Sequence, residues 1–591
     1  MNLTPSQDRA INSKARQILA ISGAGSGKTL VLCHRIARLL DSGASPESLL
    51  VLTFTNRAAD NMRTRLVDLL IERDWKGKEA YAAVRGMMMG TFHSIALRIL
   101  HLHADRIGYA PNLTVADQDD ADLLLKTVAR DHDYYDGDWK RGMSWKTLKG
   151  FREAQYTGGA FAFSPNQKRD GVQLAVVTLI AEYWQRLRAM NVLDFGLLLR
   201  EVQRLFRECP DVLEQYRERF KHVLIDECQD LDRVQYNLWE YFVPPATLFA
   251  VGDFRQSIYQ FRGASPEVLR GKMTDGTLSP EIIDLRENFR SGRLIVEASN
   301  RLIAHNGDTL AQPMLSVPDS GDGAVRVVEA ELAIVADELK RWHGGFGGFA
   351  WRDMAVLARK KRTLTDLEQP LRDAGIPYQR VGSAFDLCQT EEFREVHAYL
   401  RLQLNRRDDL AFLRLHVLNR SSLEYATIRS IAADRGCAHV EADDTIAGLY
   451  WVTSGDEPLH TAIASPFWGP RHGPALKFWL DCPEETLSDA LRWYAALHMD
   501  RGEDYRERDC VTLATIHAAK GLEWPLVLVA HMNEGELPAG LCKTGEEILE
   551  ERRVAYVGLT RAKQILILHS QPENAERHVK PPSRFLEEIR L

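Results

Sequence analysis

Short apolar runs that end in glycine-rich or acidic stretches dominate the hydrophobic pattern of this chain. The first run, Ile18-Leu19-Ala20-Ile21, is followed by a glycine-rich stretch and then by Leu30-Val31-Leu32-Cys33-His34-Arg35-Ile36. A short apolar run bounded by turn residues predicts a strand, and apolar residues at helical spacing predict an amphipathic helix. We therefore expect a strand, a tight turn and a helix in this order.

A second run of the same kind lies roughly 200 residues further along the chain. His222-Val223-Leu224-Ile225 leads directly into the acidic pair Asp226-Glu227. Apolar, β-branched residues of this kind suit a strand buried in a parallel sheet, and the carboxyl end of such a strand delivers polar groups to a ligand. The pattern predicts a buried parallel strand with two carboxylates at its end.

The glycine-rich turn after the first run carries the first candidate chemistry. It reads Ser22-Gly23-Ala24-Gly25-Ser26-Gly27-Lys28-Thr29. Between a strand and a helix, its backbone N–H groups would cradle phosphates, Lys28 would add charge, and the Thr29 hydroxyl would hold Mg²⁺. The strict phosphate-loop pattern has glycine at position 22. Taken alone, the stretch could therefore also be a flexible turn.

The acidic pair supplies the groups that hydrolysis requires. Asp226 would hold Mg²⁺, directly or through water, and Glu227 would accept the proton of the attacking water. An isolated Asp-Glu pair is more often a solvated turn. Downstream of a phosphate loop, the pair predicts a nucleoside triphosphatase.

Seven further segments follow the order of motifs in one known family. They are residues 3–7, 53–63, 90–94, 251–264, 285–291, 515–524 and 552–562. With the phosphate loop and the acidic strand, they closely resemble the motifs of the UvrD/Rep-like superfamily 1 helicases. The resemblance extends from residue 3 to about residue 570.

The resemblance implies an α/β fold of two RecA-like parallel-sheet ATPase domains, each with a mainly helical inserted domain. The expected boundaries are 1–90 and 206–283 for the first RecA-like domain, 91–205 for its insertion, 284–380 and 508–591 for the second RecA-like domain, and 381–507 for a reduced second insertion. The second RecA-like domain would contain the apolar runs at 354–357 and 526–529.

For the nucleotide, the resemblance implies ATP and Mg²⁺. The phosphates would lie on Gly23, Ala24, Gly25, Ser26, Gly27, Lys28 and Thr29, and the metal on Thr29 and Asp226. Gln7 would read the adenine edge, Phe289 would stack on the adenine, and Glu523 would approach the ribose.

The resemblance also implies a device that links the two domains. Arg290 and Arg561 would reach the γ-phosphate from the second domain, where each could raise the rate by about 10³–10⁵. Gln256 would sense the same phosphate and couple it to the DNA groove. For an isolated arginine, a surface ion pair is the alternative.

The expected partner is single-stranded DNA, including junctions between single-stranded and duplex DNA. Phe54, Tyr259, Phe261 and His517 would face successive bases, Arg262 and Arg359 would follow the phosphates, and His93 belongs to a motif of the same group. Stacking contributes roughly 1–3 kcal/mol per base and tolerates any sequence. Core packing is the alternative for Phe54 and Phe261.

Several positions depart from the family pattern. Leu30 stands where many relatives have arginine, Phe289 replaces a tyrosine, and Phe261 replaces a tryptophan. Phe254-Arg255 replaces an acidic pair that is common in the coupling motif. The duplex-contact element that relatives carry is missing near residue 420, and the tail after Arg561 is short. We therefore expect competent single-strand translocation but weak unwinding of long duplexes by the monomer.

Composition limits the kinds of partner, metal site and cellular compartment that we expect for this chain. The net charge of −7 over 591 residues gives no global sign of a polyanion partner, so any nucleic-acid surface must be local. Eight cysteines without a CxxC pair argue against a disulfide framework or a zinc site. The sequence has neither a long apolar run nor a signal-peptide pattern, so we expect a cytoplasmic protein that is not bound to membranes.

The sequence is compatible with two functions. The first is an ATP-dependent 3′→5′ translocase on single-stranded DNA that separates the duplex ahead of it. The second is a DNA-stimulated ATPase subunit that licenses a protein partner, such as a nuclease or repair factor, with little unwinding of its own. A strand-displacement assay on the protein alone would distinguish them.

Overall fold

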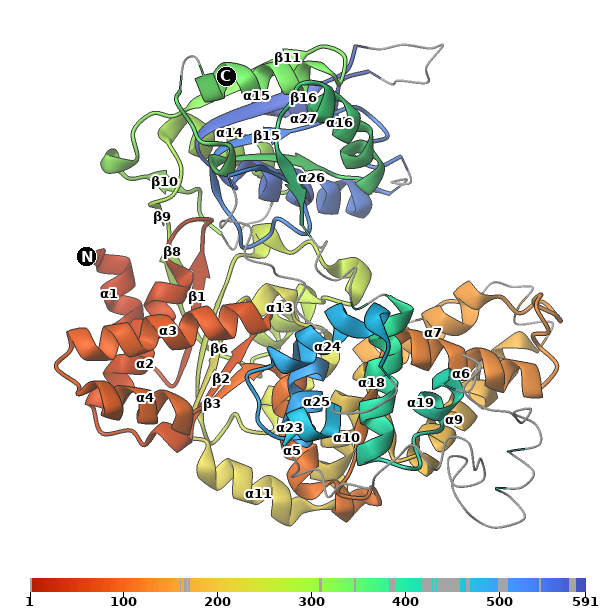
Figure 1. Ribbon diagram of the computed structural model, residues 1–591. Coiled ribbons are helices and arrows are strands. Elements are labelled where there is room, and N and C mark those ends of the chain that lie inside the picture. Colours follow the sequence, from red (N-terminus) through yellow and green to blue (C-terminus); the bar gives the residue numbers. More distant parts are fainter. Residues whose placement is uncertain are drawn as a thin grey trace.

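Two parallel sheets, each of six strands, organise the chain (Figure 1). The computed structural model describes residues 3–159, 161–163, 167, 171–307, 311–344, 347–381, 388, 390–415, 428, 432, 458–463, 468–497, 509–540, 544–572 and 581–590. The α/β architecture confirms the predicted fold class. The predicted boundaries of the four domains stay a prediction.

The first sheet has the strand order β3-β2-β6-β7-β1-β8, and every neighbouring pair is parallel. Its strands are β1 (Gln17–Ser22), β2 (Leu49–Thr53), β3 (Met88–Thr91), β6 (His222–Ile225), β7 (Thr247–Gly252) and β8 (Glu281–Leu285). Helices α1 (Pro5–Asn12), α2 (Lys28–Asp41), α3 (Asn56–Glu72) and α4 (Gly77–Gly86) accompany it. The strands predicted at 18–21 and 222–225 are confirmed, as is the helix after the glycine-rich turn.

The second sheet has the strand order β11-β16-β15-β12-β14-β13 and is also parallel throughout. Its strands are β11 (Ala324–Glu329), β12 (Met354–Ala358), β13 (Tyr378–Arg380), β14 (Val511–Thr515), β15 (Trp524–Val529) and β16 (Ala562–Ser570). Its helices are α14 (Arg293–Ala304), α15 (Ile334–Gly344), α16 (Lys361–Asp373), α26 (Gly545–Leu559) and α27 (Arg584–Ile589). The apolar runs at 354–357 and 526–529 lie in β12 and β15.

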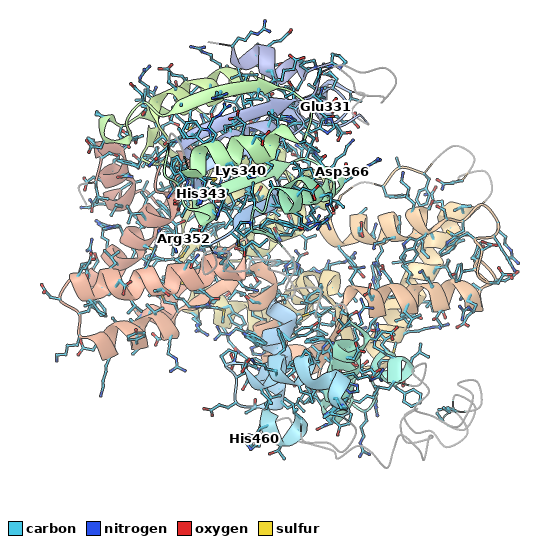
Figure 2. All side chains as sticks on the ribbon, turned by 45° about the horizontal axis from the view of Figure 1, so that its top comes forward. Glu331, Lys340, His343, Arg352, Asp366 and His460 are labelled. Carbon is cyan, nitrogen blue, oxygen red and sulfur yellow. The ribbon has the colours of Figure 1, made fainter. Side chains whose placement is uncertain are left out.

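A short parallel pair, β9 (Glu287–Asn288) and β10 (Leu315–Ser316), lies between the two sheets in Figure 1. In Figure 2, Glu331, Lys340 and His343 mark the end of the molecule that carries the second sheet, and His460 of α23 (Leu459–Ile463) lies at the opposite end. Within the described ranges, no helix combines the length and the apolar composition that crossing a bilayer requires.

The segment expected as the first insertion is mainly helical. It contains α5 (Phe92–His103), α6 (Gln118–Asp131), α7 (Trp145–Thr157), α9 (Val172–Ala189) and α10 (Phe195–Glu208). It also contains a parallel pair of short strands, β4 (Thr114–Ala116) and β5 (Val192–Asp194), which the sequence did not predict. After α10 the chain returns to the first sheet through α11 (Pro210–Arg219).

The described part of the second insertion lies beside the first (Figure 1). Its helices are α18 (Glu391–Leu404), α19 (Asp409–Leu415), α23, α24 (Gly473–Leu480) and α25 (Leu487–Leu497). Their core is rich in aromatic residues, with Phe393, Trp479 and Tyr494 in mutual ring contact. The element predicted to be missing near residue 420 lies outside the described residues.

A buried ionic network joins the two insertions. Arg401 of α18, which is 1% exposed, forms ion pairs with Asp120 of α6 and, at 2.8 Å, with Asp408. Arg414 of α19 pairs with the other oxygen of Asp120 at 2.7 Å. Charges removed from water need such partners, because an unpaired buried charge is strongly destabilising. The network therefore fixes the second insertion against the first.

Candidate ATPase site and nucleic-acid interface

The phosphate loop connects β1 to α2 at the carboxyl edge of the first sheet. Gly25 and Gly27 have φ values of +67° and +79°, which side-chain-bearing residues rarely adopt. A Cβ on Gly25 would also lie 2.6 Å from Cβ of Arg290. Ser22 fits in place of the expected glycine, because its buried hydroxyl donates to the carbonyl oxygen of Gly252 in β7 at 3.0 Å.

Gln7 lies directly against the phosphate loop. Its Nε2 donates to the carbonyl oxygen of Ser26 at 3.0 Å, and its Oε1 accepts from the N–H of Thr4 at 3.0 Å. Thr4 and Gln7 form a capping box at the start of α1, which orients the carboxamide. The structure thus brings Gln7 to the nucleotide-binding loop, and its contact with adenine stays a prediction.

The acidic pair at the end of β6 faces the phosphate loop. The Thr29 hydroxyl donates to Oδ2 of Asp226 at 3.4 Å, and Nζ of Lys28 lies 3.5 Å from Oε1 of Glu227. Burial, followed by the charge of Glu227, raises the pKa of Asp226. Burial alone would also raise the pKa of Glu227, but the positive charges of Lys28 and Lys520 outweigh it and hold this pKa below its usual value. Glu227 is therefore ionised at neutral pH, as a general base must be.

The backbone at Glu227 is strained. Its φ of 51° and ψ of 43° place a non-glycine residue in the left-handed region. Such residues cluster at functional sites, where the surrounding structure holds them in place. Here Gln229, which is fully buried, donates from Nε2 to Oε2 of Glu227 at 2.6 Å. The strained turn and this hydrogen bond together aim the carboxylate of Glu227.

Gln256 connects the two sheets. It ends η4 (Phe254–Gln256), directly after β7. Its Nε2 donates to Oδ2 of Asp253 at 2.8 Å, and its Oε1 accepts from Nη2 of Arg561 at 2.9 Å. Arg561 is 1% exposed, and burial followed by the charge of Arg290 lowers its pKa to about 9. The predicted sensor and a predicted γ-phosphate arginine are therefore in direct contact.

The other predicted γ-phosphate arginine, Arg290, is held by Glu523, the residue predicted to approach the ribose. Nε of Arg290 lies 2.6 Å from Oε2 of Glu523, and Nζ of Lys563 lies 2.8 Å from Oε1 of the same carboxylate. Burial raises the pKa of Glu523, but Arg290 and Lys563 outweigh it and lower this pKa to about 2. The backbone N–H of Phe289 donates to the carbonyl oxygen of Gly25 at 2.9 Å, and the side chain of Phe289 is 45% exposed.

Sequence reasoning missed three residues that hold this site together. Nδ2 of Asn288 donates to the carbonyl oxygen of Ala24 at 2.7 Å, which docks the segment of Arg290 on the phosphate loop. Nζ of Lys520 forms an ion pair with Asp230 and donates to the carbonyl oxygen of Gln256 at 2.7 Å. Asn288 and Lys520 stand inside matched motifs, and Asp230 follows the acidic pair by three positions, but the sequence did not show which groups these residues contact.

Four predicted DNA-facing residues form one aromatic cluster. The rings of Phe54 and Tyr259 are stacked at 5.1 Å with an interplanar angle of 18°. Phe261 and His517 meet edge to face at 5.4 Å, and the Tyr259 hydroxyl donates to the carbonyl oxygen of His517 at 3.3 Å. Phe261 is 65% exposed, which rules out core packing for this ring. The cluster draws on both halves of the chain.

Cations surround this aromatic cluster. The Arg262 guanidinium lies 5.5 Å from the ring centre of Tyr259 and 5.7 Å from that of Phe261, and Nζ of Lys520 lies 4.8 Å from the ring centre of Tyr259. Burial, followed by Arg359 and Arg262, lowers the pKa of His517 to about 4, so His517 is neutral at neutral pH.

Arg359 and His93, which were also predicted to contact DNA, are not part of the aromatic cluster. Arg359 is engaged by the buried carboxylate of Glu551, with Nη2 2.8 Å from Oε1. His93 lies in the first turn of α5, where burial lowers its pKa to about 4. Among the described residues, no ring contact joins His93 to the aromatic cluster. The phosphate contact of Arg359 and the DNA contact of His93 stay predictions.

These features define a nucleotide hydrolase whose site lies between two domains. The first domain supplies a phosphate loop faced by an acidic strand, and the second domain supplies arginines beside that loop. The chain belongs to the UvrD/Rep-like family of ATP-dependent DNA helicases. The UvrD/REP helicase N-terminal domain matches residues 3–275. The UvrD-like helicase C-terminal domain matches residues 283–447 and 481–572.

Individual relatives agree along nearly the whole chain. DNA helicase II of Haemophilus influenzae is 30% identical, with 97% of this chain and 84% of the relative covered. ATP-dependent DNA helicase UvrD1 of Mycobacterium tuberculosis is 31% identical, with 99% and 85% covered. DNA helicase II of Escherichia coli is 29% identical, with 100% and 87% covered. The predicted resemblance is confirmed.

Proposed function

We propose that this protein is a Mg²⁺- and ATP-dependent translocase that moves 3′→5′ on single-stranded DNA and separates duplex at single-strand junctions. The observation that carries the proposal is the position of one segment between two sites. Gln256 contacts Arg561 of the second domain, and Tyr259, three residues later, stacks in the aromatic cluster. Movement of this segment would change both the nucleotide site and the aromatic cluster.

At the nucleotide, each group has one task. The backbone of the phosphate loop and Lys28 bind the phosphates. Glu227, ionised at neutral pH, accepts the proton of the attacking water. Arg290 and Arg561 neutralise the charge that develops on the phosphoryl oxygens, an effect worth about 10³–10⁵ in rate.

The residues present also fit a magnesium ion. The Thr29 hydroxyl and the Asp226 carboxylate are hard oxygen donors 3.4 Å apart beside the phosphate loop. Mg²⁺ prefers one or two such protein ligands together with phosphate oxygens and water. When bound, the ion would supply positive charge to the phosphates. Thr29 and Asp226 would hold it, and Lys28 would add its own positive charge to the phosphates.

Lys520 supports the link between the nucleotide and DNA. Its ammonium group touches Asp230 and the backbone of Gln256 on the nucleotide side, and lies over the ring of Tyr259 on the DNA side. A base that stacks on the cluster would move Tyr259 and hence this ammonium group. Such a contact favours closure of the two domains when DNA is bound.

A duplex with a 3′ single-stranded tail tests the proposal, and the matched control is the same duplex with a 5′ tail. We expect ATP-dependent strand separation on the 3′-tailed substrate and little on the 5′-tailed one. Robust DNA-stimulated ATP hydrolysis without strand separation on either substrate would instead support the subunit that licenses a partner nuclease or repair factor.

A further inference from the structure

Arg255 carries a charge opposite to the one that this position usually has in the family. The coupling motif commonly has an acidic pair where this chain has Phe254-Arg255. Arg255 is only 5% exposed, so the charge is buried rather than solvated. A buried guanidinium requires dedicated partners, because its removal from water is costly. These partners reveal what the substitution does.

The guanidinium of Arg255 bonds to three separate segments. Its Nε donates to Oδ1 of Asp253 at 3.2 Å within the coupling motif. Its Nη2 lies 3.4 Å from the carbonyl oxygen of Ser22, at the start of the phosphate loop. Its Nη1 donates at 2.9 Å to the carbonyl oxygen of Gln312, in the segment between α14 and β10. One side chain thus ties the coupling motif to the phosphate loop and to the second domain.

Asp253 is shared between Arg255 and Gln256. One carboxylate oxygen accepts from Arg255 and the other accepts from Nε2 of Gln256. Because Nε2 of Gln256 is held in this way, its Oε1 points to Nη2 of Arg561. The carboxamide has one donor end and one acceptor end, so this arrangement also fixes which end faces the arginine. The orientation of Gln256 therefore depends on a carboxylate that Arg255 holds.

We propose that Arg255 is a positioning residue that acts through Asp253 to orient Gln256 toward Arg561, and that it links this orientation to the phosphate loop. The inference rests on the proposed role of Gln256 in ATP hydrolysis. Arg255 touches no reacting atom in this scheme. Its planar fork reaches three separate acceptors from three different nitrogens, whereas a lysine donates from a single ammonium centre.

Steady-state ATP hydrolysis with saturating single-stranded DNA tests the proposal, using Arg255→Met, Arg255→Lys, Gln256→Ala and the double variant Arg255→Met/Gln256→Ala. The matched control is Arg286→Met. Nε of Arg286 donates at 3.1 Å to the carbonyl oxygen of Pro313, next to the residue that Arg255 contacts. Arg286 therefore reports what losing an arginine contact to the same segment does by itself. Thermal unfolding of each variant accompanies the kinetics.

We expect kcat of Arg255→Met to fall roughly tenfold, because a misoriented Gln256 would cost about as much transition-state stabilisation as one charge-assisted hydrogen bond. KM for ATP should stay within about threefold, because the phosphate-binding groups remain. Arg255→Lys should recover part of kcat. In the Gln256→Ala background, Arg255→Met should have no further effect on kcat, because the residue it positions is already missing. Arg286→Met should retain the wild-type kcat.

Multiplicative effects of Arg255→Met and Gln256→Ala on kcat would overturn the proposal, as would an unchanged kcat in Arg255→Met with only a lower melting temperature. If Arg255→Met fails to fold, the comparison of Arg255→Lys in the wild-type and Gln256→Ala backgrounds decides in the same way. Failure of the proposed role of Gln256 looks different, since the wild-type protein and Gln256→Ala would then hydrolyse ATP at the same rate with DNA.

Discussion

Gln256 accepts a hydrogen bond from Arg561 across the space between the two sheets, with 2.9 Å between Oε1 and Nη2. Gln256 follows β7 of the first sheet, and Arg561 directly precedes β16 of the second. The two residues are 305 positions apart in the sequence. The relative position of the two domains therefore decides whether this contact forms, and with it whether Arg561 is held against the coupling motif.

Replacement of the general base should separate binding from hydrolysis. In Glu227→Gln the carboxamide cannot accept the proton of water, so kcat for ATP should fall by about 10²–10⁴ while nucleotide binding persists. Lys28→Ala should instead weaken binding of the phosphates and abolish turnover. Equilibrium binding of a fluorescent ATP analogue and phosphate release measure the two effects. Near-normal turnover in Glu227→Gln would show that another group is the base.

Arg561→Lys should reduce ATP turnover even though the positive charge is retained. Lysine lacks the fork that serves Gln256 and the carbonyl oxygens around Arg561, so it cannot reach the phosphoryl oxygens in the same geometry. We expect a loss in kcat that approaches 10³. The matched control is Arg584→Lys, at an exposed ion pair with Glu534. Equal losses in both variants would contradict the assignment of Arg561.

Removal of the exposed ring of Phe261 should weaken DNA binding without a sequence preference. Phe261→Ala should lose roughly 1–3 kcal/mol of single-strand affinity, the contribution of one stacked base. Fluorescence anisotropy on oligonucleotides of one length and different sequences measures it. Tyr81→Ala, at a ring of α4 that is 61% exposed and outside the aromatic cluster, is the control. A similar loss in Tyr81→Ala would show that the cluster is not the DNA site.

Arg401→Met should destabilise the contact between the two insertions. The substitution leaves Asp120 and Asp408 buried with fewer partners, and breaking a buried pair in this way costs about 3–5 kcal/mol. Arg394→Met removes a more exposed ion pair between the same two helices, with Asp119, and should cost at most about 1 kcal/mol. Urea unfolding followed by tryptophan fluorescence compares the two. Equal costs would mean that the buried network does not fix the insertions.

The strands and the candidate site were predictable to different extents. The apolar runs at 18–21 and 222–225 predicted β1 and β6, because buried parallel strands are continuously apolar in sequence. Motif order placed Gln256, Arg290 and Arg561 in one site. The pairing of β4 with β5 was not predictable, since strands of three residues leave no periodic signal.

Polar contacts between residues far apart in the chain were the second feature that the sequence did not predict. The burial of Arg401 between two insertions gave no sign in the sequence, because an arginine in a helix of mixed composition looks like a surface residue. Lys520 and Asp230 lie 290 positions apart, and only the folded chain shows that they form an ion pair. The motifs named the residues near the nucleotide, but the contacts that orient them came from the structure.

The direction of movement tests the central claim most directly. Streptavidin is bound to biotin at either the 5′ or the 3′ end of otherwise identical single-stranded oligonucleotides, and its ATP-dependent release by dilute protein is timed, with Glu227→Gln as the control for hydrolysis. We predict rapid release from the 5′ end, slow release from the 3′ end, and no ATP-dependent release by Glu227→Gln. Faster release from the 3′ end, or DNA-stimulated hydrolysis without release from either end, would contradict the central claim.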